Sequence, residues 1–513
     1  MIDFLKAKKD KIDYDVNNCV MSGEPLKIEI LATPGDLILE IPGIIEKTIP
    51  DLKDIKFVYL IDEYENIKEE HQKYINTLVR EIRKPSSLRI GVRLYGFSTR
   101  ETYSAREQIK SGAEVEEFAL DKYFRGKKRQ KNYKDFASRL CARRLESNFP
   151  VFTEIKNSHD AFKELDEYFE KPGSSPFEIE QTRFVLDRYK NEERPYFDHL
   201  RRKLSENFNG CEIKGVSSQS SINEIISNLK MPDYPLIEKF NVFSIYQSWF
   251  QKKDIVEKSQ EIKSECIQFT DNPETKSDFS IHFNYWKFDL LSQLFRECGQ
   301  KQKYLGLETF IDLSHGLPRN LLVILKNIYN WSIFNGEEPF KKSKISERSQ
   351  LAGVKEASYW FLKDAEIPGI NFFQTVEPGI RRLCEFFREL RFADKPVEVS
   401  LASFCFDLAK ISEDARKTIE WAEKTSLLIG QQNERKDKNS LRIDRTYALN
   451  RMLSPMWDLP VARRSVLPLA PDEVEAIFDA KKEDEFKEIL NRRRVRMNAP
   501  FKELEKQRTL FEV

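Results

Sequence analysis

The chain has 513 residues, long enough for roughly three domains that each bury a core. Its 85 Lys+Arg balance 84 Asp+Glu, and the formal net charge of +1 excludes a global attraction to nucleic acid or membrane. No apolar run approaches the length of about 18 residues that a membrane span needs, and the N-terminus has no apolar signal core, so we expect a cytoplasmic protein without a membrane partner. The seven cysteines are scattered and never form a C-x-x-C pair, which argues against structural zinc and a disulfide framework.

Two strands are expected early in the chain. The segment "PLKIEIL", residues 25–31, predicts a short strand. In "KFVYLIDEYENI" the five consecutive apolar residues Phe57 to Ile61 predict a strand that is covered on both faces, as in a parallel sheet. Asp62 and Glu63 then stand at the carboxyl end of that strand, and ligands bind at this edge in open α/β sheets.

A βαβ unit follows from the next segments. In "KEEHQKYINTLVREIRK" the residues Tyr74, Leu78 and Ile82 recur every four positions, which predicts one helix face. The segment "LRIGVRLYG" predicts a second buried strand over residues 88–94, and "VEEFAL", residues 115–120, predicts a third. Strand, helix and strand in this order form a βαβ unit, whose crossover is nearly always right-handed.

The middle of the chain is charged and helical. From residue 150 to residue 280 we expect a helical insert or linker, with polar breaks at "KPGSSP", "GVSSQSS" and "FTDNPETKSD". Further on, residues 317–334 predict one helix that "GLP" opens, with Pro318 near its first turn, where the missing N–H removes no hydrogen bond.

The last third has the order of a winged helix. The segments "IRRLCEFFREL" and "SLASFCFDLAKI" predict helices, and "SEDARKTIEWAEKTSLLI" predicts a serine-capped helix that runs into a strand. The segment "GQQNERKDKNSLRIDRTYALN" predicts a polar hairpin. Three helices followed by a β-hairpin form a module that can place its third helix in a DNA major groove, although such modules also dock proteins.

Four apolar residues followed by Asp62 and Glu63 form a Walker B pattern. In such a motif the aspartate holds a magnesium ion and the glutamate polarises the water that attacks the γ-phosphate. A buried strand that ends in acidic residues at a solvated loop is also a common structural feature. The functional interpretation gains support from the next predicted strand. Arg93 lies near the end of that strand, and Thr99 and Arg100 follow shortly after it, where a polar side chain can sense the γ-phosphate.

The segment "HGLPRNLL" is a second signal. A short loop followed by a helix with an arginine in its first turn is what a lid helix needs to bring Arg319 onto a nucleotide phosphate by a charge-assisted hydrogen bond. The alternative is that Arg319 only caps or pairs at the start of its helix.

Two basic segments are candidates for contact with nucleic acid. Residues 122–144 hold ten Lys or Arg against one Asp, with Tyr123, Phe124, Tyr133 and Phe136 interleaved. Clustered cations neutralise phosphates, and aromatic rings can stack on bases, although a basic run can also be a solvated helix face. The nucleic-acid-binding residues that we expect are Lys127, Lys128, Arg129 and Lys131 in this segment and Arg435, Lys436 and Lys438 in the hairpin.

Other sites have less support in the sequence. The five histidines are too dispersed for a metal site or a catalytic triad. Asp62, Glu63 and Glu65 could hold a nuclease metal, but the sequence shows no lysine close by on a neighbouring strand.

Taken in order, these segments resemble AAA+ ATPases of the origin-recognition-complex-like group. The resemblance rests on "FVYLIDE", the following helix, the strand "LRIGVR", the "GLPRNLL" helix and the C-terminal winged-helix pattern, over residues 25–144 and 285–450. It implies an α/β fold with a partial AAA+-type parallel sheet that has helices on both faces, a helical lid and a C-terminal winged helix. The expected domains are an AAA+-like core (1–145), a charged helical insert (146–280), a lid (281–370), a winged helix (371–460) and a helical tail (461–513).

The resemblance also implies ATP and Mg²⁺ as cofactors, and DNA and another AAA+ subunit as partners. It assigns Asp62 to magnesium, Glu63 to water activation, Arg93 or Thr99 to the first sensor, Arg319 to the second sensor, and Arg100 or Arg106 to an arginine finger toward a neighbouring subunit.

The sequence departs from this family at the phosphate-binding loop. No G-x-x-x-x-G-K-[ST] motif is present, although the glycines and the lysine of that motif are what cradle and neutralise the phosphates. We therefore expect impaired hydrolysis and consider three explanations: a chain shortened at its N-terminus, a degenerate subunit, or a split arrangement with the loop on another polypeptide. The alternative function is a non-enzymatic DNA- or protein-binding scaffold that keeps the AAA+ shape.

Overall fold

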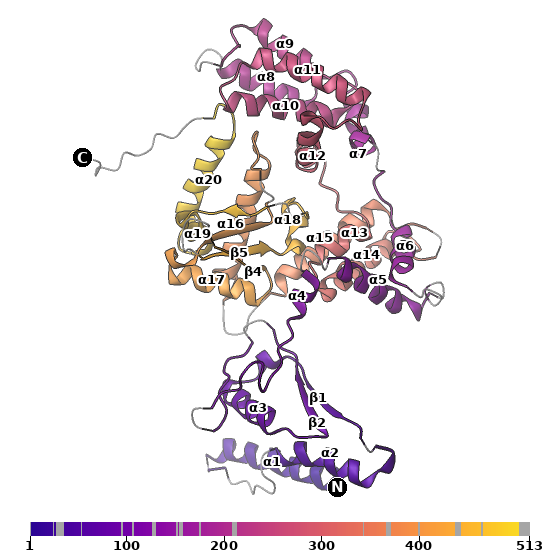
Figure 1. Cartoon of the computed structure of the whole chain (residues 1–513), viewed down its shortest axis with the longest axis vertical. Helices are drawn as coiled ribbons and strands as arrows, with labels where there is room; N and C mark the ends of the chain where they lie inside the picture. Colours follow the sequence, from indigo (N-terminus) through magenta and orange to yellow (C-terminus); the bar gives the residue numbers. More distant parts are fainter. Residues whose placement is uncertain are drawn as a thin grey trace, which may run out of the picture. The chain divides into compact units, whose positions relative to one another are not determined.

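The structure is a computed structural model that divides into two compact units, Met1–Phe118 and Ala119–Val513 (Figure 1). It describes the chain except for residues 1, 24, 27–34, 53, 94–95, 105–106, 126–129, 150–151, 153–156, 174–175, 208–212, 342, 366–370, 399–400, 437–442, 463–464 and 502–513. The expected strand over residues 25–31 lies largely outside the described residues.

The first unit contains a βαβ unit, as the sequence predicts. Strands β1 and β2 pair in parallel from Phe57 opposite Ser86 to Ile61 opposite Ile90, and α3 connects them. The elements of this unit are α1 (Ile2–Ser22), α2 (Asp36–Thr48), η1 (Pro50–Leu52), β1 (Phe57–Ile61), η2 (Tyr64–Asn66), α3 (Glu69–Glu81) and β2 (Ser86–Ile90).

Three details of the first unit differ from the sequence predictions. Strand β1 is not covered on both faces by the described residues, because Val58 and Leu60 are 45% and 77% exposed while the alternate side chains are half-buried. Strand β2 begins two residues earlier than expected and ends at Ile90. Residues 115–120 form no strand, because Val115 makes only an isolated bridge to Ser111 and Leu120 already begins a helix.

The second unit is mostly helical. The prediction of helices between residues 150 and 280 is confirmed for the described residues, and so is the single helix that begins at Pro318. The elements of its first part are α4 (Leu120–Arg125), α5 (Gln130–Glu146), α6 (Ser158–Glu167), η4 (Pro176–Glu178), α7 (Ile179–Arg188), α8 (Pro195–Asn207), α9 (Gln219–Leu229), α10 (Pro235–Phe250), α11 (Ile255–Asp271), α12 (Asp278–Glu297), α13 (Leu307–Leu313), α14 (Pro318–Phe334) and α15 (Glu347–Lys363).

The C-terminal part of this unit adds a small mixed sheet with strand order β4-β5-β3-β6. Its elements are α16 (Phe372–Arg391), β3 (Ser403–Asp407), η5 (Leu408–Lys410), α17 (Glu413–Lys424), β4 (Leu428–Lys436), β5 (Ile443–Leu449), η6 (Arg451–Leu453), α18 (Ser454–Trp457), β6 (Leu467–Pro468), α19 (Pro471–Phe478) and α20 (Glu483–Met497). Together with β1 and β2, this sheet confirms an α/β fold with small sheets. The predicted serine cap and hairpin are also confirmed, because Ser412 accepts from the Ala415 N–H and β4 pairs antiparallel with β5.

The predicted helix over "SLASFCFDLAKI" is wrong, because Ser403–Asp407 form strand β3. The aromatic rings of this segment alternate with smaller side chains, as a strand requires. Phe404 stacks on Tyr447 of β5 at 5.9 Å between ring centroids and on Phe478 of α19 at 5.8 Å, and Phe406 stacks on Tyr447 at 5.7 Å. These tertiary contacts, to a neighbouring strand and to α19, decide the local structure.

The second unit is built around two hydrophobic cores. One core consists of side chains of α7–α12, and Ala499 near the end of the described chain joins it. The other core consists of side chains of α5, α6, α13–α17, the small sheet and α19–α20. The helical segment α7–α12 therefore has a core of its own (Figure 1).

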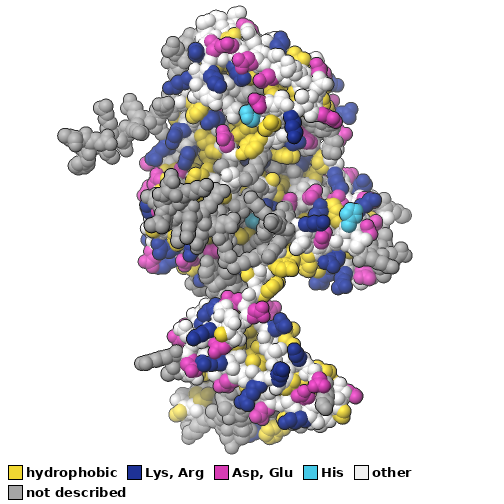
Figure 2. All heavy atoms as spheres, in the orientation of Figure 1, with side chains coloured by type: hydrophobic (Ala, Val, Ile, Leu, Met, Phe, Trp, Pro, Cys, Tyr) yellow, Lys and Arg dark blue, Asp and Glu magenta, His cyan; other side chains and the backbone are white. Residues whose placement is uncertain are grey.

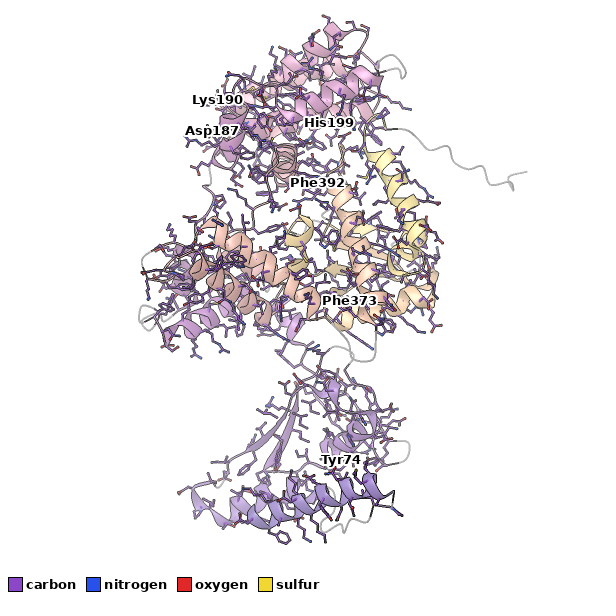
Figure 3. The ribbon with its side chains drawn as sticks, turned by 180° about the vertical axis from the view of Figure 1, so that it is seen from behind. Tyr74, Asp187, Lys190, His199, Phe373 and Phe392 are labelled. Atoms are coloured by element: carbon purple, nitrogen blue, oxygen red, sulfur yellow. The ribbon has the colours of Figure 1, made fainter. Side chains whose placement is uncertain are left out.

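Asp394 links the α7–α12 segment to the C-terminal part of the chain. Its carboxylate bonds His199 Nε2 at 3.1 Å, accepts from Lys203 of α8, and accepts from the Ala499 N–H at 3.0 Å. Figure 3 labels His199 on α8 and Phe392 at the end of α16, two residues before Asp394. Burial alone would raise the pKa of Asp394, but the hydrogen bond with His199 and the charge of Lys203 outweigh it, so the pKa is lowered.

Asp394 should therefore make the unit sensitive to acid. Because its folded pKa is lowered, its contribution is fully present above the ordinary pKa of about 3.9 and is lost as the pH falls through the folded value. We expect Asp394→Asn to lower the free energy of unfolding at neutral pH and to flatten its decrease below a pH of about 4. Urea unfolding measured across this pH range tests the expectation, and a variant with an unchanged pH profile contradicts it.

The described surface carries both signs of charge. Figure 2 shows Lys and Arg side chains interspersed with Asp and Glu over the face in view, in agreement with the balanced composition. Among the described residues, no helix combines the length and the apolar character that crossing a membrane requires.

Candidate functional site

Asp62 and Glu63 lie where the Walker B pattern places them, directly after the last residue of β1. Both residues are exposed. The Glu63 N–H donates to Asp62 Oδ1 at 2.9 Å, and Asn66 Nδ2 donates to Glu63 Oε2 at 3.1 Å. Glu63 has a left-handed backbone, with φ 51° and ψ 44°, which turns the chain sharply out of the strand.

The second strand passes close to this turn. Gly91 N–H donates to Ile61 O at 2.7 Å, and Tyr64 N–H donates to Gly91 O at 3.1 Å, so the ladder continues to the carboxylates. A Cβ at position 91 would lie 2.9 Å from Asp62 Oδ1. Glycine therefore allows the backbone to approach the Asp62 carboxylate.

Arg93 lies at the same edge and is held by Glu65. The Arg93 N–H donates to Glu65 Oε2 at 3.1 Å, and Arg93 Nε lies 3.1 Å from Glu65 Oε1. Glu65 thereby fixes both the backbone and the side chain of Arg93. A nucleotide phosphate would have to compete with this carboxylate for the guanidinium group.

Three buried polar side chains connect this edge to the loop after β2, residues 96–101. Tyr64, Gln72 and Asn76 are all 0% exposed. Gln72 Nε2 donates to Tyr64 O, Ile67 O and Gly96 O at 3.1–3.2 Å, and Gln72 Oε1 accepts from the Ser98 N–H at 2.9 Å. Burial raises the pKa of Tyr64 to about 12, so its hydroxyl stays protonated as a donor.

Asn76 binds the next part of the same loop. Its Nδ2 donates to Thr99 O at 3.1 Å and to Glu101 O at 2.9 Å, and its Oδ1 accepts from the Tyr64 hydroxyl at 3.0 Å. Sequence reasoning missed this network because it looked for an apolar face on α3. The signal was two amide side chains four residues apart, which lie on one helix face.

The loop carries Thr99 and Arg100 in different surroundings. Thr99 Oγ1 is half-buried and accepts from the Glu101 N–H at 3.1 Å. Arg100 extends to Glu117, with 2.6 Å between Nη2 and Oε1, and lies 5.7 Å from the ring of Phe97. Arg106, the other candidate finger, is outside the described residues.

Arg319 lies in the first turn of α14, as the sequence predicts. It is 64% exposed, pairs with Asp364 at 3.3 Å and lies over the ring of Trp360 at 5.3 Å. Both partners belong to the C-terminal end of α15. The structure thus gives Arg319 a local ion pair at a helix start, the arrangement that the sequence left open as the alternative.

A family model described as ORC-CDC6-like matches residues 1–469 of the chain. The chain belongs to the ORC-CDC6-like family, a group of AAA+ ATPases. Searches of the curated proteins and of the solved structures found no match. Helices α19 and α20 follow the matched range, yet they belong to the same hydrophobic core as α16 and α17.

In this ORC-CDC6-like chain the aromatic residues of the first basic segment mostly pack inside. Tyr133 is buried, and its hydroxyl lies 2.6 Å from Ser314 Oγ. Phe124 stacks on Phe136 at 5.0 Å, and both pack against the hydrophobic core. These three rings therefore serve the internal packing of α4 and α5. Tyr123 is exposed.

The cations of this segment have varied surroundings. Lys131 is exposed on α5 together with Arg139, Arg143 and Arg144. Lys134 instead pairs with Glu308 at 2.9 Å and lies over the ring of Phe162 at 3.8 Å. Lys127, Lys128 and Arg129 lie outside the described residues.

The hairpin of this family member places Arg435 and Lys436 in β4, opposite Asp444 and Ile443 of β5. Lys438 lies outside the described residues. The helix before the hairpin, α17, carries side chains of both charges on its surface. Its exposed side chains are Glu413, Asp414, Lys417, Glu420 and Lys424.

Within the described residues, no three His, Cys, Asp or Glu side chains lie close enough together to hold a metal ion. The resemblance assigns magnesium to the Asp62 carboxylate. Such an ion usually keeps several waters and nucleotide phosphates as its other ligands, so one or two carboxylates suffice.

Proposed function

We propose that this chain is an AAA+-type nucleotide-binding module that acts with ATP, Mg²⁺ and DNA. The observation that carries the proposal is the edge of the β1–β2 sheet. At this edge Asp62 and Glu63 directly follow β1, and Arg93 and the loop with Thr99 follow the parallel strand β2. Asp62 would hold magnesium, Glu63 would activate water, and Thr99 or Arg93 would sense the γ-phosphate.

The proposal extends to the other parts of the fold. In it, β1 and β2 belong to an AAA+-type core (1–145), residues 146–280 are an insert, and α13–α15 belong to a lid (281–370) with Arg319 as second sensor. Residues 371–460 form a winged helix, followed by a helical tail (461–513). The order helix, strand, helix and hairpin from α16 to β5, with β3 paired to β5, supports a winged helix.

A second candidate is a scaffold that keeps the AAA+ shape without using nucleotide. The observation that favours it is the absence of a G-x-x-x-x-G-K-[ST] loop from the sequence. Losing one well-placed donor to a developing charge slows a reaction by about 10² to 10³, and here the entire phosphate cradle is missing. Hydrolysis by this chain would therefore require a phosphate-binding loop that these 513 residues do not supply.

Equilibrium binding of a fluorescent ATP analogue, with magnesium, separates the two candidates. Under the proposal we expect saturable binding that weakens in Asp62→Asn, which removes the proposed magnesium ligand, and in Arg319→Ala, which removes the proposed second sensor. Glu308→Gln, a change at an exposed carboxylate on α13, serves as the control and should bind like the wild type. The absence of binding up to millimolar analogue would favour the scaffold.

DNA contact by the hairpin is the second part of the proposal. The carboxylates of Glu413, Asp414 and Glu420 are exposed on α17. If α17 entered the major groove, the DNA phosphates would repel them, so we expect the hairpin cations to make the contact instead. Neutralising Arg435, Lys436 and Lys438 should weaken binding to all duplex sequences. The slope of log K against log salt should become shallower by about 0.9 for each DNA phosphate that the protein no longer neutralises.

The matched control for the hairpin variant is Lys417→Ala. This lysine lies on α17 and pairs with Glu413 at 2.6 Å, so its charge is already compensated. The control should change duplex binding little. Salt-dependent binding that is unchanged in the hairpin variant would reject this DNA contact.

A further inference from the structure

The buried face of α3 carries amides where most amphipathic helices carry apolar side chains. Gln72 and Asn76 are four residues apart and fully buried, and Tyr64 lies between them and the end of β1. The hydrogen bonds that these amides make to the backbone reach two segments. One segment is the exit of β1, at Tyr64 and Ile67, and the other is the loop 96–101.

We propose that Gln72 and Asn76 are positioning residues that hold the loop 96–101 at a fixed place relative to Asp62 and Glu63. Tyr64 is the link between them, because its hydroxyl donates to Asn76 Oδ1 and to Gln72 O while its backbone N–H and C=O face Gly91 and Gln72. The carboxylates and the sensing loop thus form one preassembled edge before any nucleotide arrives. The role of this edge in nucleotide sensing rests on the proposed function, whereas the positioning itself does not.

The geometry distinguishes positioning from ordinary core packing. The loop 96–101 has little regular structure of its own, so its Ser98 N–H and the carbonyls of Gly96, Thr99 and Glu101 need partners from elsewhere. An apolar residue at position 72 or 76 would fill the same space but leave these groups unpaired. The ring of Phe97, 5.1 Å from the ring of Tyr64, adds an apolar contact to the same anchor.

Amide hydrogen exchange in the absence of nucleotide tests the positioning directly. The variants are Gln72→Met, which keeps the length of the side chain but removes all its hydrogen bonds, and Asn76→Asp. The aspartate keeps an acceptor for the Tyr64 hydroxyl but loses the two donors to Thr99 O and Glu101 O. We expect exchange in residues 96–101 to accelerate about tenfold or more, as the loss of two hydrogen bonds to the loop implies, while β1 and the rest of α3 stay protected.

Thr77→Val is the matched control on the same helix. Thr77 Oγ1 accepts from the Tyr103 N–H at 3.0 Å. The loss of this hydrogen bond affects the chain just after the loop, so the exchange rates of residues 96–101 should not change. Unchanged exchange of the loop in Gln72→Met and Asn76→Asp would overturn the proposal. Faster exchange spread evenly over residues 35–118 would also overturn the proposal, because the Gln72 and Asn76 side chains would then stabilise the whole unit and not the loop in particular.

A second measurement separates this inference from the proposed function. If the wild-type chain binds and hydrolyses ATP, alone or with a polypeptide that supplies the phosphate-binding loop, Asn76→Asp should lower turnover more than it lowers analogue affinity, because the sensing loop is displaced while the Asp62 ligand remains. Equal loss of both would contradict positioning. If the wild type binds no analogue, the proposed function fails, and hydrogen exchange alone decides whether Gln72 and Asn76 position the loop.

Discussion

Replacing Arg391 with methionine is expected to lower the free energy of unfolding of the second unit by about 3–5 kcal/mol. The Arg391 side chain is 2% exposed, and its guanidinium donates to Asp289 at 3.1 Å, Gln302 at 2.7 Å, Ser292 at 2.8 Å and the Asp458 carbonyl. Asp289 and Ser292 belong to α12, so this arginine of α16 ties the two hydrophobic cores together. Methionine would fill the space but remove the ion pair with Asp289 and the other hydrogen bonds of the guanidinium.

Urea unfolding followed by tryptophan fluorescence measures this loss, because the buried Trp286 lies on α12 beside the junction. Arg381→Met is the control on the same helix. Arg381 is 54% exposed and pairs with Glu377 at 3.8 Å, so its replacement should change stability by about 0–1 kcal/mol. A loss of similar size in the two variants would mean that the Arg391 network contributes no more than a surface pair.

Patterns of apolar residues predicted much of the fold. The run Phe57–Ile61 and the spacing on α3 identified the βαβ unit, and Pro318 marked the start of α14. The same logic failed at Ser403–Asp407, because a short segment with Phe404 and Phe406 fits either period. Tertiary contacts to Tyr447 and Phe478 then decide between helix and strand, and no local pattern contains them.

The candidate site was predictable only in part. Asp62 and Glu63 could be located because a motif fixes them relative to a strand. Gln72 and Asn76 could not, because an amide on a helix is expected to face solvent until its partners are known, and those partners are backbone groups some 25 residues away in the chain. Arg319 was placed correctly on its helix, but its contacts with Asp364 and Trp360 come from α15 and have no signature in the sequence.

Under the proposed function, Glu63→Gln is expected to abolish any ATP hydrolysis measured for this chain, alone or together with a polypeptide that supplies the phosphate-binding loop, while nucleotide binding is kept. Glutamine has the same length and still offers an oxygen to Asn66 Nδ2, so the turn after β1 should persist. It carries no negative charge and cannot polarise the attacking water as a carboxylate does. The loss of this electrostatic and proton-accepting role should lower the rate by about 10² to 10³ or more.

Glu65→Gln is the informative companion to this variant. Glu65 lies two residues further along and holds Arg93, so its replacement should shift Arg93 without touching the group that activates water. A smaller loss of turnover in Glu65→Gln than in Glu63→Gln, with analogue binding kept in both, would assign the chemistry to Glu63. Hydrolysis that survives in Glu63→Gln would instead place the chemistry on groups other than Glu63. The β1–β2 edge of this chain would then serve only to bind nucleotide or to hold the shape of the module.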